Sequence, residues 1–141
     1  MDPGSIVLAG FGASLIGLAT LVLLRRGRET LDLPTALGVV ASADASTAFV
    51  AGAVALIALG VGWAFVFATA WALADLPVNA LTGAAFGVAR WIAAEAAAAR
   101  LAGRAGRTDR AILRPRGESL AILGSHVVYG AAVGELYRPG S

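Results

Sequence analysis

Four long apolar runs, separated by shorter polar segments, dominate the pattern of the chain. Each run is rich in Ala, Gly, Leu and Val, contains no proline, and is close to the roughly 20 residues that a helix needs to cross a bilayer. Because backbone polar groups in hydrocarbon must be satisfied within the segment, we expect helices. The pattern predicts an all-α fold, a single integral membrane four-helix bundle. Its spans cover about residues 6–24, 48–74, 78–101 and 120–137.

Composition supports lipid rather than water as the surroundings of the chain. Of the 141 residues, 58% are hydrophobic and only 14% are charged, outside the balance typical of soluble domains. The absence of cysteine excludes disulfides, and a single histidine excludes a site built from several imidazoles of one chain. We therefore expect no metal and no cofactor, since a haem or metal at His126 would need ligands from a second chain.

The basic residues predict the orientation. All eleven are arginines, and most lie between the apolar runs, which indicates membrane topology rather than nucleic-acid binding. Residues 25–47 carry three arginines and residues 102–119 carry five, whereas the N-terminus and the turn near Asp75 carry none. This charge bias places both basic segments in the cytoplasm and both termini outside, in a bacterial or archaeal cytoplasmic membrane.

The ends of the first run decide between a span and a signal peptide. Its positive charges follow the apolar stretch instead of preceding it, which predicts a retained span. The segment 31–47 is too short and polar for a span, and we expect a surface or interfacial segment with a brief helix after Pro34.

Two glycine pairs predict close helix packing. Helices in lipid associate through tight contacts, and small residues four apart let two backbones approach. The third run contains Gly83 and Gly87, and the fourth contains Gly130 and Gly134. On a helical wheel with 100° per residue, Arg90 lies on the same face as Gly83 and Gly87, and His126 lies on the same face as Gly130 and Gly134. We expect these faces to pack against each other or against a second subunit.

Arg90 is the most unusual residue of the apolar runs, because an arginine at that depth costs at least about 2.5 kcal/mol on insertion scales. One hypothesis is that it bonds carbonyls and hydroxyls, such as those of Thr82 and Tyr129, or meets Glu95 of another copy. The other is an anion or substrate site.

The remaining intramembrane polar residues each allow a structural and a functional interpretation. Glu95 either reaches toward Arg100 or a loop arginine, or exchanges protons as a buried carboxylate whose pKa is raised.

His126 is expected to be neutral and to bond a hydroxyl or carbonyl across helices. Glu135, about 180° from His126 on the wheel, is expected at the interface beside Tyr137 and Arg138. Ser125 is expected to bond back to its own helix.

No sequence feature supports catalysis, because nucleophile elbows, phosphate loops, metal motifs and dinucleotide fingerprints are absent. We therefore expect a protein that is not an enzyme.

The second half of the chain resembles a known family. The run "SHVVYGAAVGELYR" is similar to the closing motif of the YagU-like bacterial inner-membrane proteins, and "GAAFGVARWIAAEAAAARLAG" is similar to their glycine-rich helix. The resemblance implies a small multi-span inner-membrane protein and no particular reaction, because the family is one of unknown function. The matching positions are Gly83, Gly87, Trp91, Glu95, Ser125, His126, Tyr129, Gly130, Glu135 and Arg138.

Two functions remain open from the sequence. The first is a membrane protein that acts by helix packing and assembly, as a homo-oligomer or with another membrane protein. The second is a small ion, proton or solute channel or transporter in which Arg90, Glu95 and His126 line a wet cavity.

Overall fold

The computed structural model describes residues 2–24, 34, 38, 41, 44–104 and 116–138. Within these ranges the long elements are all helices, which confirms the predicted all-α class, and each helix overlaps one predicted run. They are α1 (Pro3–Leu24), α3 (Ala45–Ala74), α4 (Ala80–Arg104) and α5 (Arg116–Leu136).

Three of these helices, α1, α3 and α5, are long and apolar enough to cross a membrane. The fourth, α4, carries Arg90 and Glu95 within its apolar stretch and is not among them. The outer surface of the bundle is nevertheless apolar on α4 as well. Leu8 of α1, Leu73 of α3 and Leu81 of α4 are 73%, 84% and 80% exposed.

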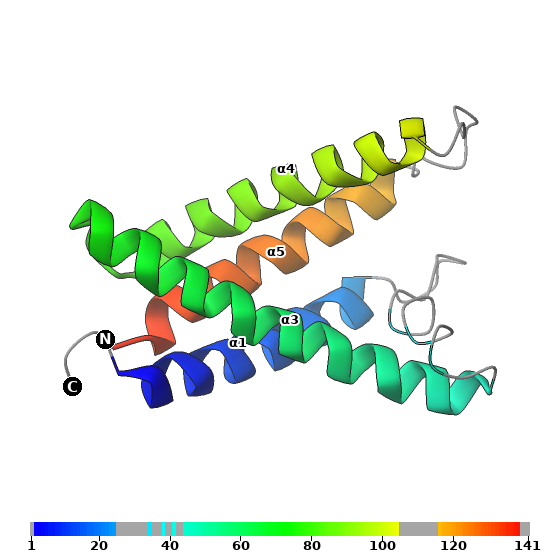
Figure 1. Ribbon diagram of the computed structural model, residues 1–141, viewed down its shortest axis with the longest axis horizontal. Helices are drawn as coiled ribbons and strands as arrows, with labels where there is room; N and C mark the ends of the chain where they lie inside the picture. Colours follow the sequence, from blue (N-terminus) through cyan, green and yellow to red (C-terminus); the bar gives the residue numbers. More distant parts are fainter. Residues whose placement is uncertain are drawn as a thin grey trace.

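The helices alternate in direction, so the bundle has two distinct ends (Figure 1). We call the end that holds Pro3, Asp75 and Leu136 the turn end, and the end that holds Leu24, Ala45 and Arg104 the loop end. Helix α5 packs closely against both α4 and α1, and α3 packs closely against α1. Both described chain ends, residues 2 and 138, therefore lie at the turn end.

A short turn joins α3 to α4 at the turn end. Asp75 adopts a left-handed conformation, with φ 51° and ψ 41°, and its N–H donates to the carbonyl of Trp71. Helix α4 then begins with a reciprocal cap: the Thr82 N–H donates to Asn79 Oδ1 at 3.0 Å, and the Asn79 N–H donates to Thr82 Oγ1 at 3.2 Å. These bonds satisfy backbone groups that helix ends leave unpaired.

Helix α3 begins with a strong cap at the loop end. The Asp44 carboxylate accepts hydrogen bonds from the hydroxyl of Ser46 at 2.6 Å, from the N–H of Thr47 at 2.9 Å and from the hydroxyl of Thr47 at 2.7 Å. Because all three bonds favour the ionised form, they lower the pKa of Asp44 to about 2, with the Ser46 hydroxyl contributing most.

Two residues of the predicted interfacial segment lie against α3. Pro34 and Gly38 are helical and buried. A Cβ on Gly52 would overlap the carbonyl oxygen of Pro34, and a Cβ on Gly38 would overlap that of Ala48. The surface position expected for the segment is therefore wrong for these two residues, because small residues on both sides allow close packing. The residues between them lie outside the described part of the chain.

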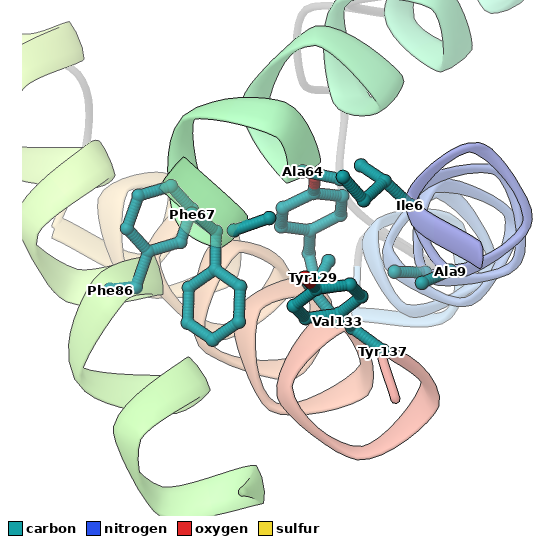
Figure 2. Packing of buried hydrophobic residues seen from close by; sticks show 10 residues of the cluster. Ile6, Ala9, Ala64, Phe67, Phe86, Tyr129, Val133 and Tyr137 are labelled. Atoms are coloured by element: carbon teal, nitrogen blue, oxygen red, sulfur yellow. The ribbon is translucent and has the colours of Figure 1, made fainter. Parts of the chain in front are cut away.

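The hydrophobic core occupies the half of the bundle nearest the turn end. Figure 2 shows how its side chains pack. Phe67 is fully buried at its centre, and its ring lies 4.5 Å from that of Trp71 and 5.2 Å from that of Phe86. The Trp71 ring packs inward against the rings of Phe67 and Phe86. The core consists of Ile6, Ala9, Ala13, Ala64, Phe67, Ala68, Phe86, Tyr129, Val133 and Tyr137.

Candidate functional site

The four predicted packing glycines lie against one another within a single chain. A Cβ on Gly83 would overlap the carbonyl oxygen of Gly130, and a Cβ on Gly130 would overlap that of Gly83. A Cβ on Gly87 would likewise overlap the carbonyl oxygen of His126, and a Cβ on Gly134 would overlap that of Asn79. We call this contact between α4 and α5 the glycine seam. Its closeness brings the middle of α4 against the polar part of α5.

Arg90 lies just beyond the seam and is held by aromatic rings. Its guanidinium carbon is 4.4 Å from the ring centroid of Tyr129 and 5.5 Å from that of Trp63. Both distances are within the range of cation–π attraction, which contributes about 2 kcal/mol or more when the pair is desolvated. That gain is comparable to the lower estimates for inserting an arginine into a membrane.

The predicted hydroxyl partners of Arg90 have other roles. Thr82 takes part in the cap of α4, and its hydroxyl donates to the carbonyl of Pro77 at 2.8 Å. Tyr129 offers Arg90 its ring, while its hydroxyl donates to the carbonyl of Gly60 on α3. No hydrogen bond joins Arg90 to either hydroxyl among the described residues, so the predicted hydroxyl contacts of Arg90 are not formed.

Beside Arg90 the bundle contains a partly open cavity of about 80 Å³ to which all four helices contribute. A cavity needs only about 10 to 15 Å³ to hold one water, so this cavity accommodates several waters or one small solute. Its lining consists of Ser14, Gly17, Leu18, Leu21, Leu56, Gly60, Arg90, Ser125, His126 and Tyr129.

The polar groups of the lining other than Arg90 bond mainly to their own helices. His126 Nδ1 lies 2.9 Å from the carbonyl of Ile122, so this nitrogen carries the proton of that bond. The Ser125 hydroxyl donates to the same carbonyl at 2.8 Å, which confirms its expected back-bonding, and the Ser14 hydroxyl donates to Gly10 at 2.6 Å. This bond of His126 Nδ1 is formed within α5.

The cavity and the core occupy successive levels along the bundle axis and share Tyr129. On α1 the core residues Ile6 to Ala13 precede the lining residues Ser14 to Leu21. On α5, which runs the opposite way, Ser125 and His126 precede Val133 and Tyr137. Helices α3 and α4 follow the same rule, with Phe67 and Phe86 on the side of the turn end. The cavity therefore lies toward the loop end, and packed side chains close it toward the turn end.

The structure does not bring the two predicted acidic residues into the cavity. Glu95 is half-buried on α4, more than one turn from Arg90 toward the loop end, and is not part of the lining. Glu135 lies near the turn end with an exposed side chain, 4.0 Å from the Arg138 guanidinium. Tyr137, expected beside them at the interface, is buried in the core instead.

Sequence reasoning missed the part of the site that comes from α1 and α3. The contact of Trp63 with Arg90 was not predicted, and Ser14, Gly17 and Gly60 were not singled out. The available signal was a serine and small residues within apolar runs. That signal does not identify which helix faces Arg90, because the pairing of helices is a tertiary property.

Comparisons with protein-family models, curated proteins and solved structures found no match to this chain. The resemblance to YagU-like proteins therefore stays a prediction. Among the described residues, no group of three His, Asp or Glu side chains is placed to hold a metal ion.

Proposed function

We propose that this chain is a four-span membrane protein that binds a small polar solute in the cavity beside Arg90. The observation that carries the proposal is the combination of a cavity lined by all four helices with a guanidinium and an imidazole inside an otherwise apolar bundle. Intramembrane ionisable residues that face a cavity typically mark ion or substrate sites.

The packing of α4 supports its role as the fourth span. Arg90 faces the interior of the bundle, whereas the exposed positions of α4 include Leu81, Val88 and Ile92. Because α4 packs along α5 through the glycine seam, a bilayer that contains α5 also surrounds α4. The cytoplasmic membrane, with the loop end inside, is the location that the arginine distribution favours.

The axial separation of cavity and core favours a carrier or receptor over an open channel. A channel needs a polar path through the bundle, but packed aromatic and aliphatic side chains occupy the half near the turn end. Of the residues in the second sequence hypothesis, Arg90 and His126 belong to this site and Glu95 does not. We assign the protein no catalytic role.

Assembly through the predicted glycine pairs receives less support. Gly83, Gly87, Gly130 and Gly134 are already in contact with one another inside one chain, so their faces are not available to a second subunit. The YagU-like resemblance is compatible with the proposed membrane location and adds no substrate.

Single-cysteine labelling tests the proposal, because the native chain contains no cysteine. In proteoliposomes, the thiols of Ser125→Cys and Leu18→Cys should react with a water-soluble methanethiosulfonate, since both positions line the cavity. The matched control is Val133→Cys, a smaller side chain two turns farther along α5 at a position with 0% exposure, which should stay unlabelled.

The proposal fails if both cavity thiols are as unreactive as the thiol at position 133 while the variants remain folded. Equal labelling at all three positions would also contradict it, because it would mean that the core admits water.

A further inference from the structure

Arg90 supplies the hydrogen-bond donors that are left in the cavity. The protons of Ser14, Ser125, Tyr129 and His126 Nδ1 go to backbone carbonyls. Among the described residues, no carboxylate pairs with the guanidinium of Arg90 and no acceptor hydrogen-bonds it; its contacts are the two aromatic rings. A guanidinium has five N–H groups. They lie at its edge, and stacking on ring faces leaves that edge available.

A cation in an apolar interior favours an anion beside it. Transfer of an unpaired charge out of water is costly, and the aromatic rings offset only part of that cost. Arg90 is the only permanently charged side chain in the described lining. One negative charge therefore balances the site, whereas a divalent anion would leave an uncompensated charge in a low-dielectric environment.

The shapes of the guanidinium and of the cavity further restrict the class of anion that can bind. A planar guanidinium matches two oxygens of a planar anion through parallel N–H bonds. The cavity volume of about 80 Å³ accommodates a small anion of a few heavy atoms.

We infer that the ligand is a small planar monovalent oxyanion, of the nitrate, bicarbonate or short-chain carboxylate type, which binds the edge of the Arg90 guanidinium and enters from the loop end. This inference rests on the proposed function and adds to it the ligand class and the side of entry. The side follows from the core, whose side chains close the path from the turn end. Of the two segments that join helices at the loop end, residues 105–115 carry three arginines and one aspartate, whereas residues 25–44 carry three of each charge. The excess of arginine in the second segment attracts anions to that side.

The test is protection of the cavity thiols by salts of stated composition. Potassium nitrate or formate, at ten times its dissociation constant, should slow the labelling of Ser125→Cys and Leu18→Cys about tenfold. Potassium sulfate at equal ionic strength should protect little. In Arg90→Gln backgrounds the protection should disappear, and Arg90→Lys should keep the charge but bind more weakly because the planar fork is lost.

Sidedness is tested with the same variants in sealed vesicles of both orientations. A membrane-impermeant reagent should label the cavity thiols only from the side on which the loop end lies.

The outcomes separate the inference from the function on which it rests. The anion assignment is wrong if nitrate, formate and sulfate protect the reactive thiols equally, or if protection persists in Arg90→Gln. Either result would still be compatible with a site for another small solute. Labelling from the opposite side alone would overturn the route of entry. Thiols that do not react at all would overturn the proposed function as well.

Discussion

Tyr129 connects its own helix to the other three. Its hydroxyl bonds the Gly60 carbonyl of α3, its ring lies 4.4 Å from the Arg90 guanidinium carbon of α4, and its Cβ lies where a side chain on Gly17 of α1 would crowd it. The hydroxyl and the ring have separable roles, because one bonds backbone and the other holds a cation.

Removal of the hydroxyl should therefore weaken the fold and spare the site. We expect Tyr129→Phe to lower the free energy of unfolding by about 0.5 to 1.5 kcal/mol, the net worth of a buried hydrogen bond. Titration with SDS in mixed micelles measures it. Tyr137→Phe, which removes a hydroxyl for which the described residues show no hydrogen bond, should cost less. Loss of nitrate protection in Tyr129→Phe would contradict the division of roles.

Asp44 gives the start of α3 a pH dependence. Its pKa is lowered from 3.8 to about 2 by hydrogen bonds in the folded chain, so folding favours the ionised carboxylate. Its stabilising contribution is fully present above about pH 3.8 and is lost as the pH falls toward 2. Asp44→Asn keeps a capping oxygen but does not titrate. Thermal unfolding in detergent should thus show a steeper loss between pH 4 and 2 in the native chain than in this variant, and parallel curves would refute this role.

For single residues, the sequence predicted which polar side chains belong to the site better than it predicted the residues that they contact. Arg90 and His126 stood out because they interrupt apolar runs, and both line the cavity. Tyr129 was expected beside Arg90 through its hydroxyl, and the structure places its ring there instead. The contact of Arg90 with Trp63 could not be predicted, because it depends on how α3 and α4 are placed in the bundle. A ring that stacks on arginine also looks in sequence like any other apolar residue.

Among the elements, the α4–α5 pair depends most directly on the absence of side chains. Backbone atoms of the two helices meet at Gly83, Gly87 and Gly130, so any Cβ there requires the helices to separate. The four-residue spacing predicted these faces, but it left open whether they meet each other or a second chain.

An alanine scan of glycines should separate the seam from ordinary helix positions. Gly130→Ala should destabilise the protein by about 1 to 3 kcal/mol through overpacking. At Gly62 an added Cβ meets no atom within 4 Å, so Gly62→Ala should be neutral or stabilising by up to about 1 kcal/mol through helix propensity. Both values come from the same SDS titration, and equal effects would argue against a close α4–α5 contact.

For the whole molecule, alternation of helix direction places both described chain ends at the turn end. The sequence predicted this arrangement, because an even number of runs that each cross the bundle once returns the chain to the side on which it began. The separation of core and cavity along the axis was not predicted, because it depends on the depth at which each helix crosses its neighbours.

The orientation prediction follows from loop charge. A cysteine appended to either terminus should react with an impermeant maleimide in intact cells, whereas Ser42→Cys, in the arginine-bearing segment between the first two runs, should react only after permeabilisation. The reverse pattern would place the basic segments outside and move the entry side of the anion with them.

The position of α5 at the centre of the close contacts affects biosynthesis. It is the last of the described helices to leave the ribosome, yet α4 packs closely on it and α1 packs on its other side. In the proposed four-span topology, α1 and α3 can pair early, but α4, with its arginine, enters the membrane before its main partner exists. That topology requires the insertion machinery to shelter a charged helix until translation of the final span is complete.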